Sequence, residues 1–78
     1  MKIRTEHDIF EGTPKQIVAQ LNATSRAHAA TNARWMEEAA DRATMVTGTD
    51  VRFDTALHFL HDLAKTGQID ILEDEKAK

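Results

Sequence analysis

Apolar positions recur along this 78-residue chain with two different periods. Residues 2–9 alternate between two sides, and the side that contains Ile3 and Ile9 is the more apolar one. This period of two predicts a half-buried strand, and residues 69–72 alternate in the same way and predict a second short strand. Between the two strands, apolar residues recur every three to four positions, which predicts helices.

The first helix is marked by the clearest local signal in the sequence. Thr13 is suited to cap the backbone N–H of Gln16, whose side chain can reach back to the N–H of Thr13. Pro14 suits the first helical position, where a missing N–H costs nothing. We therefore expect a helix over residues 14–27.

The second helix is predicted at 32–47, and its two faces are well separated. Its apolar arc consists of Trp35, Met36, Ala39, Ala40, Ala43 and Val46. The charged residues on the opposite side are Arg34, Glu37, Glu38, Asp41 and Arg42. Thr31 or Asn32 is the expected N-cap, and Gly48 is the expected left-handed stop.

The third helix is predicted at 55–66, with Asp54 or Thr55 as its cap and Gly67 at its end. Its inward stripe consists of Ala56, Phe59, Leu60, Leu63 and Ala64. The segment before it is expected to be an extended connector, with Val51 and Phe53 on the same side.

These elements predict one α+β domain over residues 1–72, in which three helices pack on a two-stranded ribbon. The chain order is strand, three helices, strand. The charged residues that would face one another across paired strands are Lys2, Arg4, Asp70 and Asp74. Residues 73–78 are charged and are expected to fray.

Composition limits the classes of function. Of the 32 hydrophobic residues, 12 are alanine, and so small a core favours either close helix packing or a partner. The absence of cysteine excludes disulfides and thiolate metal sites. No apolar run exceeds three residues, whereas a membrane-spanning helix needs about twenty, and no secretory signal is visible at the start. We therefore expect a cytoplasmic protein with no membrane partner.

Two histidines at helical spacing, His58 and His61, are the candidate metal ligands. They share a face with Asp54 and Asp62, opposite the apolar stripe, so this face is interpreted as the solvated side of the third helix. Pairs between His58 and either aspartate explain the pattern without a metal. No metal or cofactor is predicted.

The carboxylates Glu37, Glu38 and Asp41 are the candidate acid–base groups. They alternate with Arg34 and Arg42 along one helix surface, which is typical of a salt-bridged solvent face. The sequence also contains no nucleophile turn and no glycine-rich phosphate loop. We therefore predict no catalytic residue and no enzymatic activity.

DNA is the alternative partner. Arg26, Arg34 and Arg42 recur every eight residues, and the helices loosely resemble a helix-turn-helix core. On a helix, however, the first and last of these arginines would be about 160° apart. The formal net charge of −3 also disfavours phosphate binding.

Trp35 and Met45 are the candidate partner-binding residues. Trp35 lies at the edge of the apolar arc, and its alternative interpretation is a core residue whose indole N–H reaches solvent or a carbonyl. Met45 falls among the charged residues of the second helix. Met and Trp are enriched in interfaces, so Met45, together with Trp35 or with Leu57 and Phe10, is a candidate border of a binding patch.

The sequence also resembles a group of short uncharacterised bacterial proteins associated with phages and mobile elements. The residues that carry this resemblance are Gly12-Thr13-Pro14, Ile17-Val18, Trp35-Met36, Ala40, Arg42, Thr47-Gly48, Val51-Arg52, Asp54, Phe59-Leu60, Leu63, Gly67 and Ile69. It implies an accessory protein that acts by binding, and it implies no activity or cofactor. We expect a non-enzymatic interaction or regulatory module whose partner is a protein, with a homodimer as one form.

Overall fold

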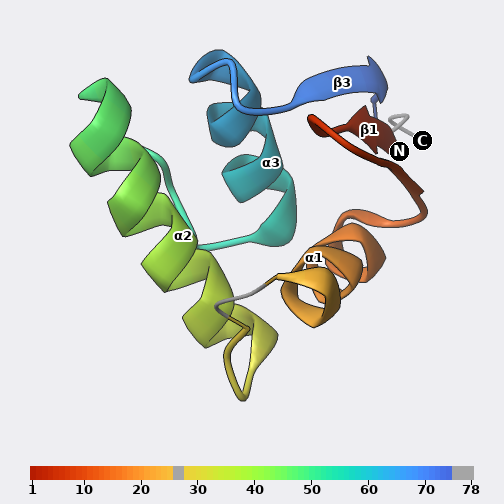
Figure 1. Cartoon of the computed structure of the whole chain (residues 1–78), viewed down its shortest axis with the longest axis horizontal. Helices are drawn as coiled ribbons and strands as arrows, with labels where there is room; N and C mark the ends of the chain where they lie inside the picture. The colour runs from red at the N-terminus through yellow and green to blue at the C-terminus, as the bar shows by residue number, and fades with distance from the viewer. Residues whose placement is uncertain (26–27, 75–78) are drawn as a thin grey trace.

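A computed structural model describes residues 1–25 and 28–74 of the chain. The elements, in chain order, are β1 (Lys2–Arg4), β2 (Ile9–Glu11), α1 (Pro14–Thr24), α2 (Asn32–Thr47), α3 (Ala56–Lys65) and β3 (Asp70–Glu73). Three helices and an antiparallel sheet confirm the predicted α+β class (Figure 1).

The sheet has three strands in the order β2-β1-β3, so the predicted two-stranded ribbon is wrong in its strand count. The expected strand over residues 2–9 is a hairpin, because the chain turns between Thr5 and Asp8. The Thr5 backbone N–H donates to the Asp8 carbonyl over 2.8 Å, and the Asp8 N–H donates to the Thr5 hydroxyl over 3.1 Å. Threonine and aspartate close this turn without glycine or proline, so the sequence carries no turn signal that interrupts the alternating pattern.

The central strand β1 fixes which side chains face the helices. Ile3 lies opposite Phe10 of β2 and Ile71 of β3, and these three residues belong to the core or pack against it. On the other face, Arg4 pairs with Asp70 over 2.9 Å, as the sequence predicted. The register shifts between Lys2 and Ile3, so that Lys2 lies opposite Glu73 in place of Leu72 and pairs with the Glu73 carboxylate over 3.4 Å. Asp74, the other carboxylate expected to face β1, contacts His61.

The helices form two layers against the sheet. α1 contacts β2, α3 contacts β3, and α2 packs on α1 and α3 without contacting any described strand (Figure 1). The buried core residues are Ile3, Ile17, Val18, Trp35, Ala40, Ala43, Val51, Ala56, Phe59, Leu60, Leu63 and Ile69. Because α2 is the outermost element, one whole face of it is left to solvent.

Local capping explains where the helices begin and end. Thr13, Thr31 and Thr55 each accept a hydrogen bond from the backbone N–H three residues later. α2 matches its predicted bounds and stops at Gly48, whose φ of 75° is left-handed. α1 ends at Thr24, earlier than expected, and the predicted end at residue 27 lies outside the described residues.

The reciprocal cap of α1 gives a direct test. Gln16 N–H donates to the Thr13 hydroxyl over 3.2 Å, and Thr13 N–H donates to Gln16 Oε1 over 2.9 Å. We expect Thr13→Ala to lower the free energy of unfolding by about 1 kcal/mol. Thr13→Ser keeps the hydroxyl and should change it by less than about half that amount. Urea unfolding followed by circular dichroism measures both, and equal losses would show that the hydroxyl has no capping role.

Candidate interaction surface

The exposed face of α2 carries a row of residues spaced by four. Glu37, Asp41 and Met45 lie along this row, and each is exposed. Met45 is 85% exposed, in agreement with its predicted place among the charged residues. The row combines one flexible apolar side chain with two carboxylates of like charge.

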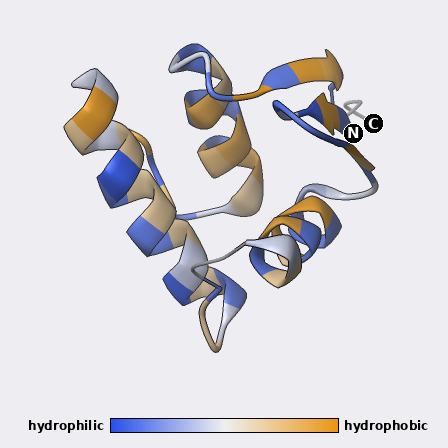
Figure 2. Ribbon diagram, in the orientation of Figure 1, coloured by the Kyte–Doolittle hydropathy of each residue, from blue (hydrophilic) through white to orange (hydrophobic). Residues whose placement is uncertain are grey.

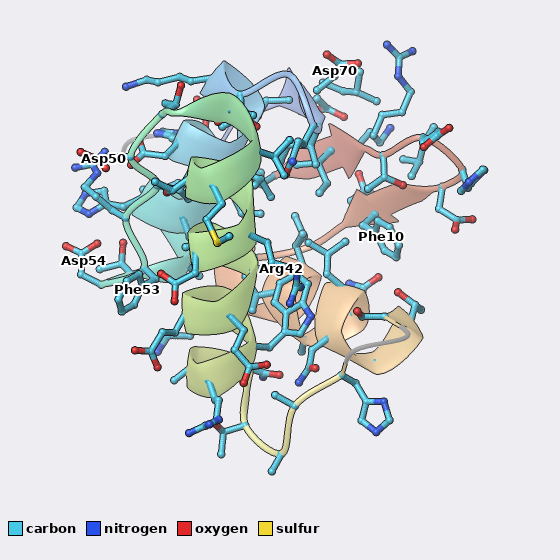
Figure 3. The ribbon with its side chains drawn as sticks, turned by 60° about the vertical axis from the view of Figure 1, so that its left-hand side comes forward. Phe10, Arg42, Asp50, Phe53, Asp54 and Asp70 are labelled. Carbon is cyan, nitrogen blue, oxygen red and sulfur yellow. The ribbon has the colours of Figure 1, made fainter. Side chains whose placement is uncertain are left out.

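The connector between α2 and α3 runs back beside this row. After the turn at Gly48, the Val51 N–H donates to the Thr44 hydroxyl over 3.4 Å, which holds the connector against α2. On the surface of α2, Thr44 lies two turns C-terminal to Glu37 and one turn C-terminal to Asp41. Figure 3 shows Asp50, Phe53 and Asp54 together on one side of α2.

Phe53 is 44% exposed whereas Val51 is buried, so the expectation that the two side chains share one side of the connector is not met. Val51 is buried, but the chain bends at Asp54 to enter α3, and this bend ends the extended alternation. The prediction for Val46 is also wrong, because this residue of the apolar arc is 78% exposed. It lies in the last full turn of α2, beyond the elements that cover the arc, and Figure 2 shows this apolar end of the helix.

We call the surface formed by these two segments the acidic flank. Its residues are Glu37, Asp41, Met45, Asp50, Phe53 and Asp54. In the described part of the chain, the side chains of Glu37, Asp41 and Asp50 form no hydrogen bond or ion pair. Asp54 accepts from His58 Nδ1 at 3.1 Å, and this hydrogen bond lowers the pKa of the Asp54 carboxyl. The flank therefore presents two apolar side chains among three carboxylates without an ion pair and a fourth that is bonded to His58.

An ion pair between the half-exposed Arg52 and the buried Asp62 anchors the connector behind the flank. Asp62 is only 4% exposed and accepts from Arg52 Nε over 2.8 Å, from Arg52 Nη2 over 3.1 Å and from the Arg52 backbone N–H over 3.0 Å. These bonds hold the pKa of the Asp62 carboxyl well below its usual range. The sequence placed Asp62 on the solvated side of α3, which is wrong because the connector covers it.

Trp35 lies in the core, 7% exposed, and its ring meets that of Phe59 edge to face at a centroid distance of 5.7 Å. Its indole Nε1 is buried without a hydrogen-bond partner, so the prediction that it reaches solvent or a carbonyl is wrong. The structure does not bring Trp35 and Met45 together. Ten helical residues separate them, which is about 15 Å along the axis.

The two candidate metal ligands have separate partners. His58 contacts Asp54, as predicted, whereas His61 Nε2 lies 2.8 Å from Asp74 Oδ1. Within residues 1–25 and 28–74, no three His, Asp or Glu side chains form a group suited to a metal ion. The expected pair between His58 and Asp62 is not formed, because Asp62 bonds to Arg52.

Two wide, open hollows of about 680 and 410 Å³ border Arg4, Thr5 and Glu6, and a smaller hollow lies between the helices. Its volume is about 180 Å³, and it is lined by Lys15, Val18, Asn32, Met36 and Ala56. Ligand pockets usually have a volume of at least about 300 Å³. None of the described helices is long and apolar enough to span a membrane. No family model, curated protein or solved structure matches the chain.

Proposed function

We propose that this chain is a non-enzymatic protein-interaction module that binds its partner through the acidic flank. The observation that carries the proposal is the exposure of Met45 on α2 and of Phe53 on the connector, two segments that the hydrogen bond from Val51 to Thr44 holds together. Single exposed apolar residues are ordinary on any protein. Here, however, a methionine and an aromatic ring lie on one flank with a charged rim, and both residue types are enriched in interfaces.

The surrounding structure suits a fixed docking surface. α2 packs on two helices, and Arg52 and Asp62 hold the connector in place by three hydrogen bonds. A surface that is already ordered loses little conformational entropy when a partner binds. The resemblance to short phage and mobile-element proteins supports an accessory role in a bacterium.

DNA binding stays the alternative. Its least favourable feature is the exposed surface of α2, where the carboxylates of Glu37 and Asp41 form no ion pair within the described residues and would repel phosphate. Fluorescence anisotropy with a random-sequence duplex, at about 50 mM and again at about 200 mM salt, tests it directly. Binding that weakens steeply with salt would replace the protein-interaction proposal.

Photo-crosslinking tests the proposal itself. A photoreactive amino acid at position 45 should give one discrete crosslinked protein in a bacterial extract, and the same group at the exposed Ala23 of α1 should not. Adding Phe53→Ser should remove most of the crosslinked product while changing the free energy of unfolding by no more than about 0.5 kcal/mol. Equal crosslinking from positions 45 and 23, or a product that survives Phe53→Ser, would contradict a docking role for the flank.

A further inference from the structure

The carboxylates of the acidic flank indicate the charge of its partner. Glu37 and Asp41 lie one turn apart, an arrangement in which like charges destabilise a helix. Asp50 adds a third unpaired carboxylate from the connector (Figure 3). A partner that places Lys or Arg between these groups would relieve their repulsion, and the contact would gain from that relief.

Two of the cations near the flank are already engaged. Arg34 Nε lies 3.2 Å from Glu38 Oε2, and Arg52 bonds to the buried Asp62. Neither arginine is free to neutralise the flank. Arg42 follows Asp41 on α2 but lies about 100° around the helix from it. The carboxylates Glu37, Asp41 and Asp50 therefore stay available to a binding partner.

A second copy of the chain does not fit this surface. In a two-fold symmetric dimer the same patch meets itself, so Asp41 and Asp50 would approach the same carboxylates of the other copy. Like charges brought together at an interface cost several kcal/mol. The homodimer that the sequence suggested is therefore disfavoured on this flank.

The backbone hydrogen bonds of the flank indicate which secondary structure a partner would use to dock there. α2 uses its N–H groups and carbonyls within the helix, and the Val51 N–H of the connector bonds to Thr44. An added β-strand would need a free backbone edge, so side-chain docking is the available mode. A helix that presents apolar residues at spacings of three and four, with cations beside them, suits Met45, Phe53 and the carboxylates around them.

We infer that the acidic flank binds a basic, amphipathic helical segment of another protein. This inference deepens the proposed function and rests on it. Apolar side chains of the segment contact Met45 and Phe53, and its Lys or Arg side chains lie over Glu37, Asp41 and Asp50.

A synthetic helix tests the inference without knowledge of the natural partner. The probe is a fluorescein-labelled leucine–lysine peptide of about 14 residues, or roughly four helical turns, and its counterpart replaces lysine by glutamate. We expect the lysine peptide to bind by fluorescence anisotropy at micromolar concentration and to bind more weakly when salt rises from about 50 to about 200 mM. The glutamate peptide should not bind.

Two triple variants with equal change in net charge locate the contact. The flank variant is Glu37→Gln, Asp41→Asn and Asp50→Asn. The matched control, on the exposed β1–β2 hairpin, is Glu6→Gln, Asp8→Asn and Glu11→Gln. We expect the flank variant to weaken binding about tenfold, because three exposed charge pairs of about 0.5 kcal/mol each sum to roughly 1.4 kcal/mol. The control should weaken it less than about twofold.

Each outcome decides the inference. Equal weakening by both triple variants would show attraction to net charge and overturn it, as would no binding of the lysine peptide up to about 100 µM. A dimer in light scattering that Met45→Ser dissociates would replace it with a second copy. The crosslinking experiment stays separate: a crosslink at position 45 that Phe53→Ser removes, with no affinity for the lysine peptide, would retain the proposed function and reject the basic partner.

Discussion

Trp35→Ala is expected to lower the free energy of unfolding by about 3–5 kcal/mol, the usual cost of truncating a buried aromatic side chain. A domain of this size has a total stability of roughly 4–12 kcal/mol. The loss is large because Trp35 joins α2 to the core through its edge-to-face contact with Phe59, while the other buried residues of α2 are Ala40 and Ala43. Urea unfolding followed by circular dichroism measures the effect.

Trp35→Phe separates packing from hydrogen bonding. This variant keeps an aromatic ring against Phe59 and removes the buried indole N–H, which has no partner. Because an unpaired buried donor costs about 1–3 kcal/mol, its removal should offset much of the lost volume. We expect a net loss of about 1 kcal/mol or less. A loss equal to that of Trp35→Ala would show that the N–H is bonded in solution, and Met45→Ala, at an exposed position, is the control and should change stability by less than about 0.5 kcal/mol.

The helices could be predicted from the sequence because their signals are local. The Thr13–Gln16 capping box, the Thr31 and Thr55 caps and the Gly48 stop each act within a few residues. The hairpin at Thr5–Asp8 was missed because its turn lacks glycine and proline and because Thr5 continues the alternating pattern. Its recognition requires the pairing of β1 with β2, which periodicity does not encode.

The candidate site was only partly predictable. Helical phase placed Met45 on the charged side of α2, and the structure confirms this position. The exposure of Phe53 depends on the bend into α3, and its place beside α2 depends on the bond from Val51 to Thr44. Both are tertiary features. The sequence instead predicted that Met45 and Trp35 border one binding patch. The structure buries Trp35, although it belongs to the same helix.

The environment of Asp62 differs most from the one that its sequence position predicts. On its own helix it lies among exposed charges, and only Arg52, ten positions earlier in the chain, makes it a buried acceptor of three hydrogen bonds. Arg52 remains half-exposed, so the pair lies at the boundary of the core. The carboxylate is therefore expected to contribute to stability through the connector that it holds in place.

We expect Asp62→Ala to lower the free energy of unfolding by about 2–4 kcal/mol at pH 7, because the backbone N–H and side chain of Arg52 lose a charged acceptor. Asp62→Asn keeps one oxygen acceptor and should lose less. The matched control is Asp70→Asn, which breaks the 2.9 Å pair with Arg4 on the exposed sheet face. Its effect should stay below about 1 kcal/mol, and an equal loss at both aspartates would show that burial of Asp62 adds nothing.

The pH dependence of stability distinguishes the charge of Asp62 from its packing. The folded-state pKa of Asp62 is lowered, first by the side-chain hydrogen bond from Arg52 and then by its backbone N–H. Its contribution is therefore fully present above the unfolded-state pKa of about 3.9 and is lost as the pH falls towards the folded-state pKa. Urea unfolding at a series of pH values from about 7 down to about 2 should show wild-type stability falling through this acid range. The Asp62→Asn profile should be flatter, and the two should converge at the acid end, whereas parallel profiles would assign the acid sensitivity to other carboxylates.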